Sequence, residues 1–112
     1  MASVGDLWIV DFGDPYLDEP ARQRPALLLG PPESFGGALP FITVVPLTTT
    51  DRGLSIHVEI DATATTGLSA TSFAQCELIR SVNRDRLVHR LGNIDPVANT
   101  RVKSIVKALL DH

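Results

Sequence analysis

Cysteine is nearly absent from this chain of 112 residues, whose single cysteine is Cys76. One cysteine forms no internal disulfide, and without a CxxC pair no structural zinc site is indicated. The longest apolar runs span only a few residues, far short of the roughly 20 that cross a bilayer. The amino terminus carries Asp6 and lacks the basic cluster and apolar segment of a secretory signal. We therefore expect a cytoplasmic protein without membrane spans, disulfides or a structural metal.

Loops that bind phosphate and the nucleophile signature of hydrolases are also missing. The sequence holds neither GxxxxGK nor GxGxxG, which excludes the usual ATP and dinucleotide sites, and it holds no GxSxG. His89 and His112 have no cysteine or carboxylate at a metal-ligand spacing, so no metal and no cofactor are predicted. Aromatic residues make up only 5% of the chain, too few for the aromatic surface that binds proline-rich peptides.

Basic residues are scarce in the first two-thirds of the chain. Residues 1–79 carry three arginines against ten carboxylates, whereas residues 80–112 carry seven basic residues against three acidic ones. The formal net charge of −3 argues weakly against a nucleic-acid partner. Eight of the ten basic residues are arginine, whose planar fork suits phosphate. The uneven distribution therefore allows a local phosphate-binding surface, and scattered solvated charges explain it equally well.

What is present is a series of short strand signals. Runs of apolar and β-branched residues bounded by glycine and proline predict strands. Trp8, Val10 and Phe12 share one face of the first strand, and the second strand reads as buried on both faces. In the fourth strand, Val58 points inward and His57 points outward into solvent. The predicted strands are 7–12, 25–29, 41–47, 55–60, 72–82 and 87–91.

One helix is predicted at the end of the chain. Asp95 is a good N-cap, and Pro96 occupies the first helical position, where its missing N–H costs nothing. From Val102 to Leu110, apolar residues recur at helical spacing and form a single stripe. Several short strands and a terminal helix over an open end of the sheet predict a small closed or half-closed barrel in one domain, residues 1–112.

Four sequence blocks, in order and over nearly the whole chain, resemble the MazF/PemK/Kid toxins. The blocks are 5–12 (GDLWIVDF), 24–28 (RPALL), 44–48 (VVPLT) and 78–82 (LIRSV). The resemblance implies an SH3-like barrel of the PemK/CcdB type that forms a homodimer. It also implies the toxin of a type II toxin–antitoxin pair, opposed by a MazE-like antitoxin, that cleaves single-stranded messenger RNA at short sequences without metal.

The resemblance assigns catalytic roles to Arg24 and Thr48, as charge stabiliser and acid and as phosphate-binding hydroxyl. From the residues alone, a surface arginine paired with Asp18 or Glu19 is the better interpretation of Arg24, and a turn threonine is the better interpretation of Thr48. Glu77 stands where one branch of the family has a base. Pairing of Glu77 with Arg80 or Arg24 is an equally good interpretation of that carboxylate.

Further residues are expected at the RNA. Two positions depart from that branch: an arginine is replaced by Gln75 and a loop histidine by Asp18, and both changes remove cations from the phosphate region. Cys76 is expected to be a packed apolar residue. The predicted RNA-binding residues are Asp18, Glu19, Thr49, Arg52, Arg80, Arg84 and Arg86.

A rival function is a non-catalytic toxin of the same fold that poisons DNA gyrase by protein contact, as CcdB-type relatives do. Those relatives depend on an exposed aromatic residue at the end of the C-terminal helix. The last residues of this chain are Leu109, Leu110, Asp111 and His112, and the lack of such an aromatic residue argues against gyrase poisoning.

Overall fold

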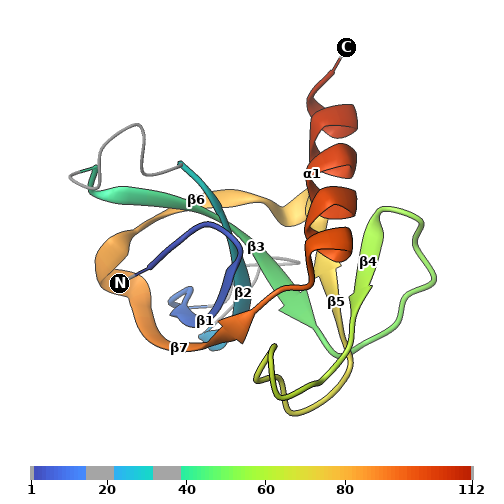
Figure 1. Ribbon diagram of the computed structural model, residues 1–112. Coiled ribbons are helices and arrows are strands. Elements are labelled where there is room, and N and C mark those ends of the chain that lie inside the picture. The colour runs from blue at the N-terminus through green and yellow to red at the C-terminus, as the bar shows by residue number, and fades with distance from the viewer. Residues whose placement is uncertain (1, 15–21, 32–38, 112) are drawn as a thin grey trace.

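The computed structural model describes residues 2–14, 22–31 and 39–111, which form seven antiparallel strands and one long helix (Figure 1). The strands are β1 (Asp6–Asp11), β2 (Gln23–Gly30), β3 (Phe41–Thr48), β4 (His57–Ile60), β5 (Ser72–Gln75), β6 (Arg80–Asn83) and β7 (Leu87–Asn93). Two short 3₁₀ helices, η2 (Cys76–Leu78) and η3 (Arg84–Arg86), flank β6, and the helix is α1 (Pro96–Leu110).

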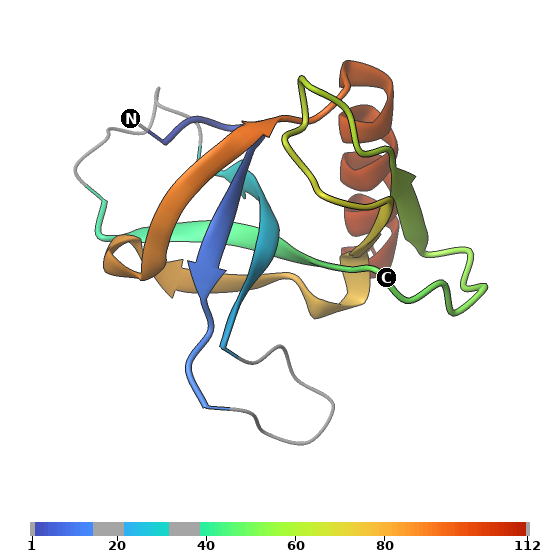
Figure 2. The same cartoon turned by 90° about the horizontal axis from the view of Figure 1, so that it is seen from below.

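The strands form one strongly curled sheet in the order β4-β5-β3-β2-β1-β7, with β6 also paired to β3. Seen from below, β7, β1 and β2 cross over β3 and β6 (Figure 2). Among the described residues, no hydrogen-bonded ladder joins β4 to β7. The predicted mainly β fold with a C-terminal helix is confirmed, and its barrel is of the half-closed kind.

The edge of β3 opposite β2 is shared by two strands. Its last residues pair with β5, Leu47 lying opposite Ala74, and its first residues pair with β6, Val44 lying opposite Arg80. Between these two pairs β3 advances three residues while the other segment advances six. The surplus is taken up by η2, so the predicted continuous strand 72–82 is wrong: it is two strands separated by a 3₁₀ turn.

The central strands are buried on both faces. Leu27 belongs to the larger core, together with Leu47 and the helix, whereas Ala26 and Leu28 belong to the smaller core with Val10. Side chains alternate between the two faces of a strand, so each face of β2 covers a different core. This confirms the prediction that the second strand is buried on both sides, and it makes β2 a rigid support for the residues at its start.

Helix α1 packs on the larger core. The Asp95 carboxylate accepts a hydrogen bond from the Ala98 backbone N–H at 3.2 Å, as expected of an N-cap. Val102 and Val106 are buried, but Leu109 and Leu110 are 42% and 66% exposed, so the predicted buried stripe is wrong in its last turn. Figure 1 shows why: the helix runs past the sheet at its carboxyl end. No helix of the described ranges is long and apolar enough to cross a membrane.

Candidate active site

Arg24 and Thr48 lie on the same face of the sheet. Ala26 on β2 pairs with Pro46 on β3. Because side chains alternate along a strand, Arg24 shares the face of Ala26, and Thr48 shares the face of Pro46. Continuing the same register by two residues sets Arg24 across from Thr48, with Cβ atoms about 5 Å apart in a regular ladder. This is the face opposite α1, and we call it the site face.

The hydroxyl of Thr48 is oriented by its own loop. Its Oγ1 accepts a hydrogen bond from the Thr50 backbone N–H at 3.2 Å. A hydroxyl has one proton to donate, so this contact leaves the O–H of Thr48 available for an incoming acceptor such as a phosphate oxygen. Arg24 is half-buried, and no carboxylate of the described residues is ion-paired with it.

A residue that the sequence analysis did not consider adjoins this pair. Phe73 on β5 lies directly opposite Thr48 on β3 and opposite Glu59 on β4. Its ring is half-buried, while Glu59 is exposed. Aromatic rings beside phosphate-binding groups stack with bases. Only the pairing of β5 with β3 brings Phe73 here, and no local sequence signal contains that pairing.

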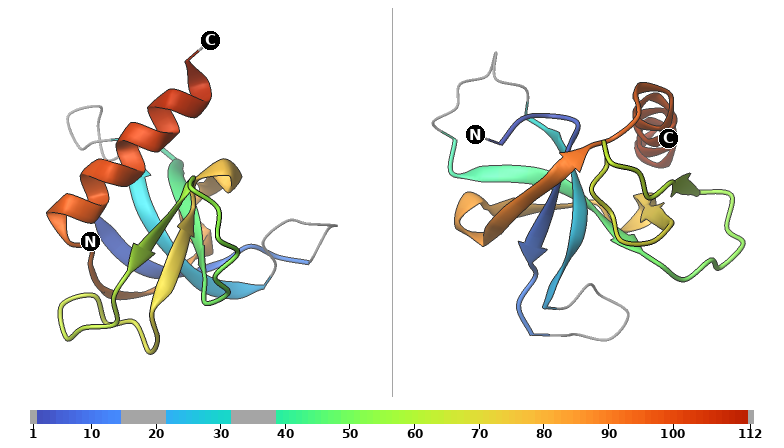
Figure 3. Two further views of the ribbon diagram at one scale, coloured as in Figure 1. Left: turned by 90° about the vertical axis from the view of Figure 1, so that its right-hand side faces the viewer. Right: turned by 60° about the horizontal axis from the view of Figure 1, so that its bottom comes forward.

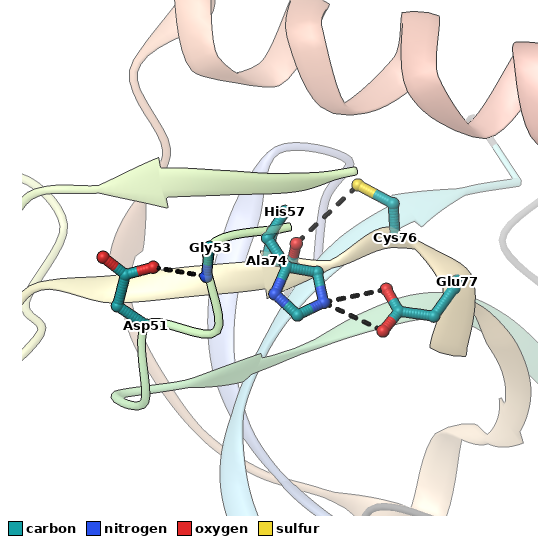
Figure 4. A network of polar contacts seen from close by, with 6 residues as sticks. All are labelled: Asp51, Gly53, His57, Ala74, Cys76 and Glu77. Carbon is teal, nitrogen blue, oxygen red and sulfur yellow. Dashed lines mark hydrogen bonds and ion pairs between the residues drawn. The ribbon is translucent and has the colours of Figure 1, made fainter. Parts of the chain in front are cut away.

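Glu77 belongs to η2 and not to a strand, and its partner is His57. The Nε2 atom of His57 lies 2.8 Å from Oε2 and 3.0 Å from Oε1 of Glu77 (Figure 4). The His57 side chain is 3% exposed and that of Glu77 is 32% exposed. The prediction of a solvated His57 is therefore wrong, and so is pairing of Glu77 with Arg80 or Arg24.

The burial of His57 has a physical cause in the register of the sheet. His57 pairs with Gln75, which immediately precedes η2. The alternation that sets His57 opposite in direction to Val58 holds, but Glu77 of η2 contacts the imidazole on that side. Cys76 turns toward α1 while Glu77 turns to the other side (Figure 4).

Three of the predicted RNA-binding arginines make contacts within the protein. The Arg80 guanidinium lies 5.6 Å from the centre of the Phe12 ring, a cation–π distance. Arg84 donates to the Leu39 carbonyl at 2.6 Å, and Arg86 donates to the Asp11 carbonyl at 3.2 Å. Arg84 and Arg86 therefore both tie η3 to distant segments of the chain.

The remaining predicted residues are exposed or lie outside the described ranges. Thr49 and Arg52 lie in the exposed loop after β3. Asp18 and Glu19 fall outside the described residues. Two backbone hydrogen bonds join the described residues on either side of that segment. The Phe12 N–H donates to the Arg22 carbonyl at 2.8 Å, and the Arg22 N–H donates to the Gly13 carbonyl at 2.6 Å. Within the described residues, no three His, Cys, Asp or Glu side chains gather as a metal site requires.

Comparison with known proteins identifies the family. A sequence profile described as "PemK-like, MazF-like toxin of type II toxin-antitoxin system" matches residues 3–110. The chain belongs to this toxin family. Endoribonuclease MazF9 of Mycobacterium tuberculosis is 29% identical, with 99% of this chain and 98% of that protein covered. A probable endoribonuclease MazF of Mycolicibacterium smegmatis is 31% identical over 95% of this chain and 91% of its own.

The fold is likewise that of MazF. A crystal structure of MazF from Deinococcus radiodurans matches with a TM-score of 0.83, covering 99% of this chain and 97% of that chain at 23% identity. The views of Figure 3 show the arrangement that this MazF-like toxin shares with that fold, with the helix along one side of the curled sheet.

The Cys76 thiol of this toxin is unreactive because it is buried. Cys76 is fully buried among the apolar residues of the larger core, as the sequence predicts. Burial, helped by the nearby negative charge of Glu77, raises the pKa of the Cys76 thiol from 9.0 to about 11. A raised pKa keeps the neutral thiol dominant at every pH at which RNA is stable.

We expect native Cys76 to react with a disulfide reagent such as DTNB at pH 8 at least about 100 times more slowly than the unfolded chain, because two pKa units reduce the thiolate about 100-fold. The measurement compares native protein with protein in guanidinium chloride. Equal rates in the two states would show that the thiol is accessible and ionised.

Proposed function

We propose that this toxin is a sequence-specific endoribonuclease that cleaves single-stranded messenger RNA through the substrate's own 2′-hydroxyl, without metal. The observation that carries the proposal is that Arg24 and Thr48 lie on the same face of the sheet, at neighbouring positions of β2 and β3. The middles of both strands are buried, and on this face they cover the smaller core. The endoribonuclease names of the mycobacterial relatives support the same activity.

The proposed reaction needs three groups, and the site face offers one for each. A base removes the 2′-hydroxyl proton, and the 2′-oxygen attacks phosphorus as the bond to the 5′-oxygen breaks. Glu77 is the proposed base, because its carboxylate is the exposed member of its pair. Arg24 meets the charge on the phosphate and donates to the departing 5′-oxygen, and Thr48 binds a phosphate oxygen. The products are a 2′,3′-cyclic phosphate and a 5′-hydroxyl.

Thr49, Arg52, Arg80 and the residues Asp18 and Glu19 are proposed to contact the RNA beyond the reacting phosphate. For Arg84 and Arg86 the proposal is narrower. Each guanidinium donates one N–H to a backbone carbonyl. An arginine has five donors in a planar fork, so the remaining N–H groups are available to a phosphate. These two residues therefore serve the fold and the RNA together.

The proposed partners follow from the family and from the surface. A type II toxin has an antitoxin, and we propose a MazE-like one whose acidic segment covers the site face and replaces phosphates with carboxylates. We also propose a two-fold homodimer in the cytoplasm. Leu39 and Phe41, which are 43% and 54% exposed at the start of β3, supply apolar surface for a second copy.

The proposed chemistry predicts cleavage in the presence of EDTA. Purified toxin should cut single-stranded RNA and leave a cyclic phosphate or its hydrolysis product and a 5′-hydroxyl, because the nucleophile belongs to the substrate. A matched oligonucleotide with 2′-deoxyribose at the cleaved position should stay intact. Loss of activity with chelator, or products that bear a 5′-phosphate, would exclude the mechanism.

Arg24→Ala should lower the cleavage rate by about two to four orders of magnitude and leave the fold intact, because the lost group meets charge that develops in the transition state. Single-turnover rates and circular dichroism measure the two effects. Arg101→Ala is the matched control, since Arg101 is an exposed arginine on α1, away from the site face. An Arg24→Ala variant as fast as the control would remove Arg24 from the mechanism.

A further inference from the structure

The His57–Glu77 pair is built in a way that fold stability alone does not explain. His57 is 3% exposed, and its Nδ1 atom is buried with no hydrogen-bond partner among the described residues. A buried polar atom without a partner destabilises the fold, a cost that an apolar side chain of similar size avoids. Among the described residues, the imidazole of His57 hydrogen-bonds only to Glu77, the more exposed member of the pair (Figure 4).

The geometry allows His57 to donate to Glu77. Nε2 lies at nearly equal distances, 3.0 and 2.8 Å, from the two oxygens of Glu77. A ring nitrogen that carries the proton donates to a carboxylate oxygen in a charge-assisted hydrogen bond. In the tautomer with the proton on Nε2, His57 is the donor and the Glu77 carboxylate is the acceptor.

Glu77 has little else to hold it. It lies in a 3₁₀ helix of three residues whose N-terminal end has no side-chain cap. A glutamate side chain has three rotatable bonds, and fixing them costs rotamer entropy. His57, itself fixed by burial on β4 opposite Gln75, offers a rigid anchor for that mobile side chain.

We propose that His57 is a positioning residue for the ribonuclease reaction: its Nε2–H holds the Glu77 carboxylate aimed across the site face. The inference rests on the proposed function, in which Glu77 is the base. At 3% exposure the imidazole does not reach RNA, so it acts only through Glu77. Gln75, its cross-strand neighbour, likewise has a buried Oε1 without a partner in the described part of the chain.

The test is a double-mutant cycle with a rescue variant. Glu77→Gln should lower kcat by about 10²–10⁴-fold, the range for loss of a general base. His57→Leu, which has no donor, should lower kcat by about 10-fold or more and change KM by less than about threefold. His57→Gln, which returns an N–H to the position of Nε2, should recover most of that loss.

In the Glu77→Gln background, His57→Leu should cause no further loss, because its target is gone. A loss of the same size in both backgrounds, or a His57→Leu variant with wild-type kcat, overturns the proposal. Thermal denaturation should show His57→Leu at least as stable as the parent, since the unpaired Nδ1 is removed. A variant that is slow only because it is partly unfolded would be equally slow with either residue at position 77.

The pair is also measurable without activity. In protein with ¹⁵N-labelled histidine, two-bond ¹H–¹⁵N correlations should show His57 Nε2 carrying a proton at neutral pH, with its resonance shifted by Glu77→Gln. An Nε2 without a proton overturns the inference even if RNA is cleaved. Absence of cleavage by the parent protein overturns the proposed function instead, so the two failures are distinct.

Discussion

The register of β3 controls the rest of the site. Two strands share one edge of β3, and the segment between them has three residues more than β3 can pair. Hydrogen bonding along that edge therefore requires a break, and η2 is the break. Cys76 and Glu77 are neighbours on this turn: Cys76 lies in the larger core, and Glu77 contacts His57 on the other side.

The two faces of the sheet have separate tasks. The face toward α1 is filled by apolar side chains and holds the helix, while the site face carries polar groups at the ends of strands whose middles are buried. Catalytic groups placed on such strands keep their geometry better than groups on loops. The costs of the arrangement are local. Two of the buried side-chain atoms without a partner in the described residues, on His57 and Gln75, belong to one cross-strand pair.

Much of this fold was predictable from the sequence, and the errors have identifiable causes. Strand alternation, the Asp95 cap and the two-sided burial of β2 are local signals, and the structure has all three. The break at η2 was not predictable, because it depends on pairing with β3, far away in the chain. His57 was misplaced for the same reason: its direction follows from alternation, but its cover comes from η2.

The site was predictable in outline only. The resemblance supplied Arg24, Thr48 and Glu77, and the structure supplies their neighbours: Phe73 opposite Thr48, and His57 on Glu77. The distribution of charge shows that the carboxyl-terminal third is basic, but it does not indicate that Arg84 and Arg86 donate hydrogen bonds to backbone carbonyls. Contacts between a side chain and a distant backbone leave no pattern in a single sequence.

The central claim is that RNA binds across the site face, opposite the helix. Nuclear magnetic resonance of ¹⁵N-labelled protein, titrated with a single-stranded RNA that 2′-O-methyl groups make resistant to cleavage, tests it most directly. If RNA binds there, the largest chemical-shift changes fall on the amides of Arg24, Thr48, Phe73 and Glu77, and those of α1 stay nearly unchanged. Changes concentrated on α1, with the site face silent, would contradict it.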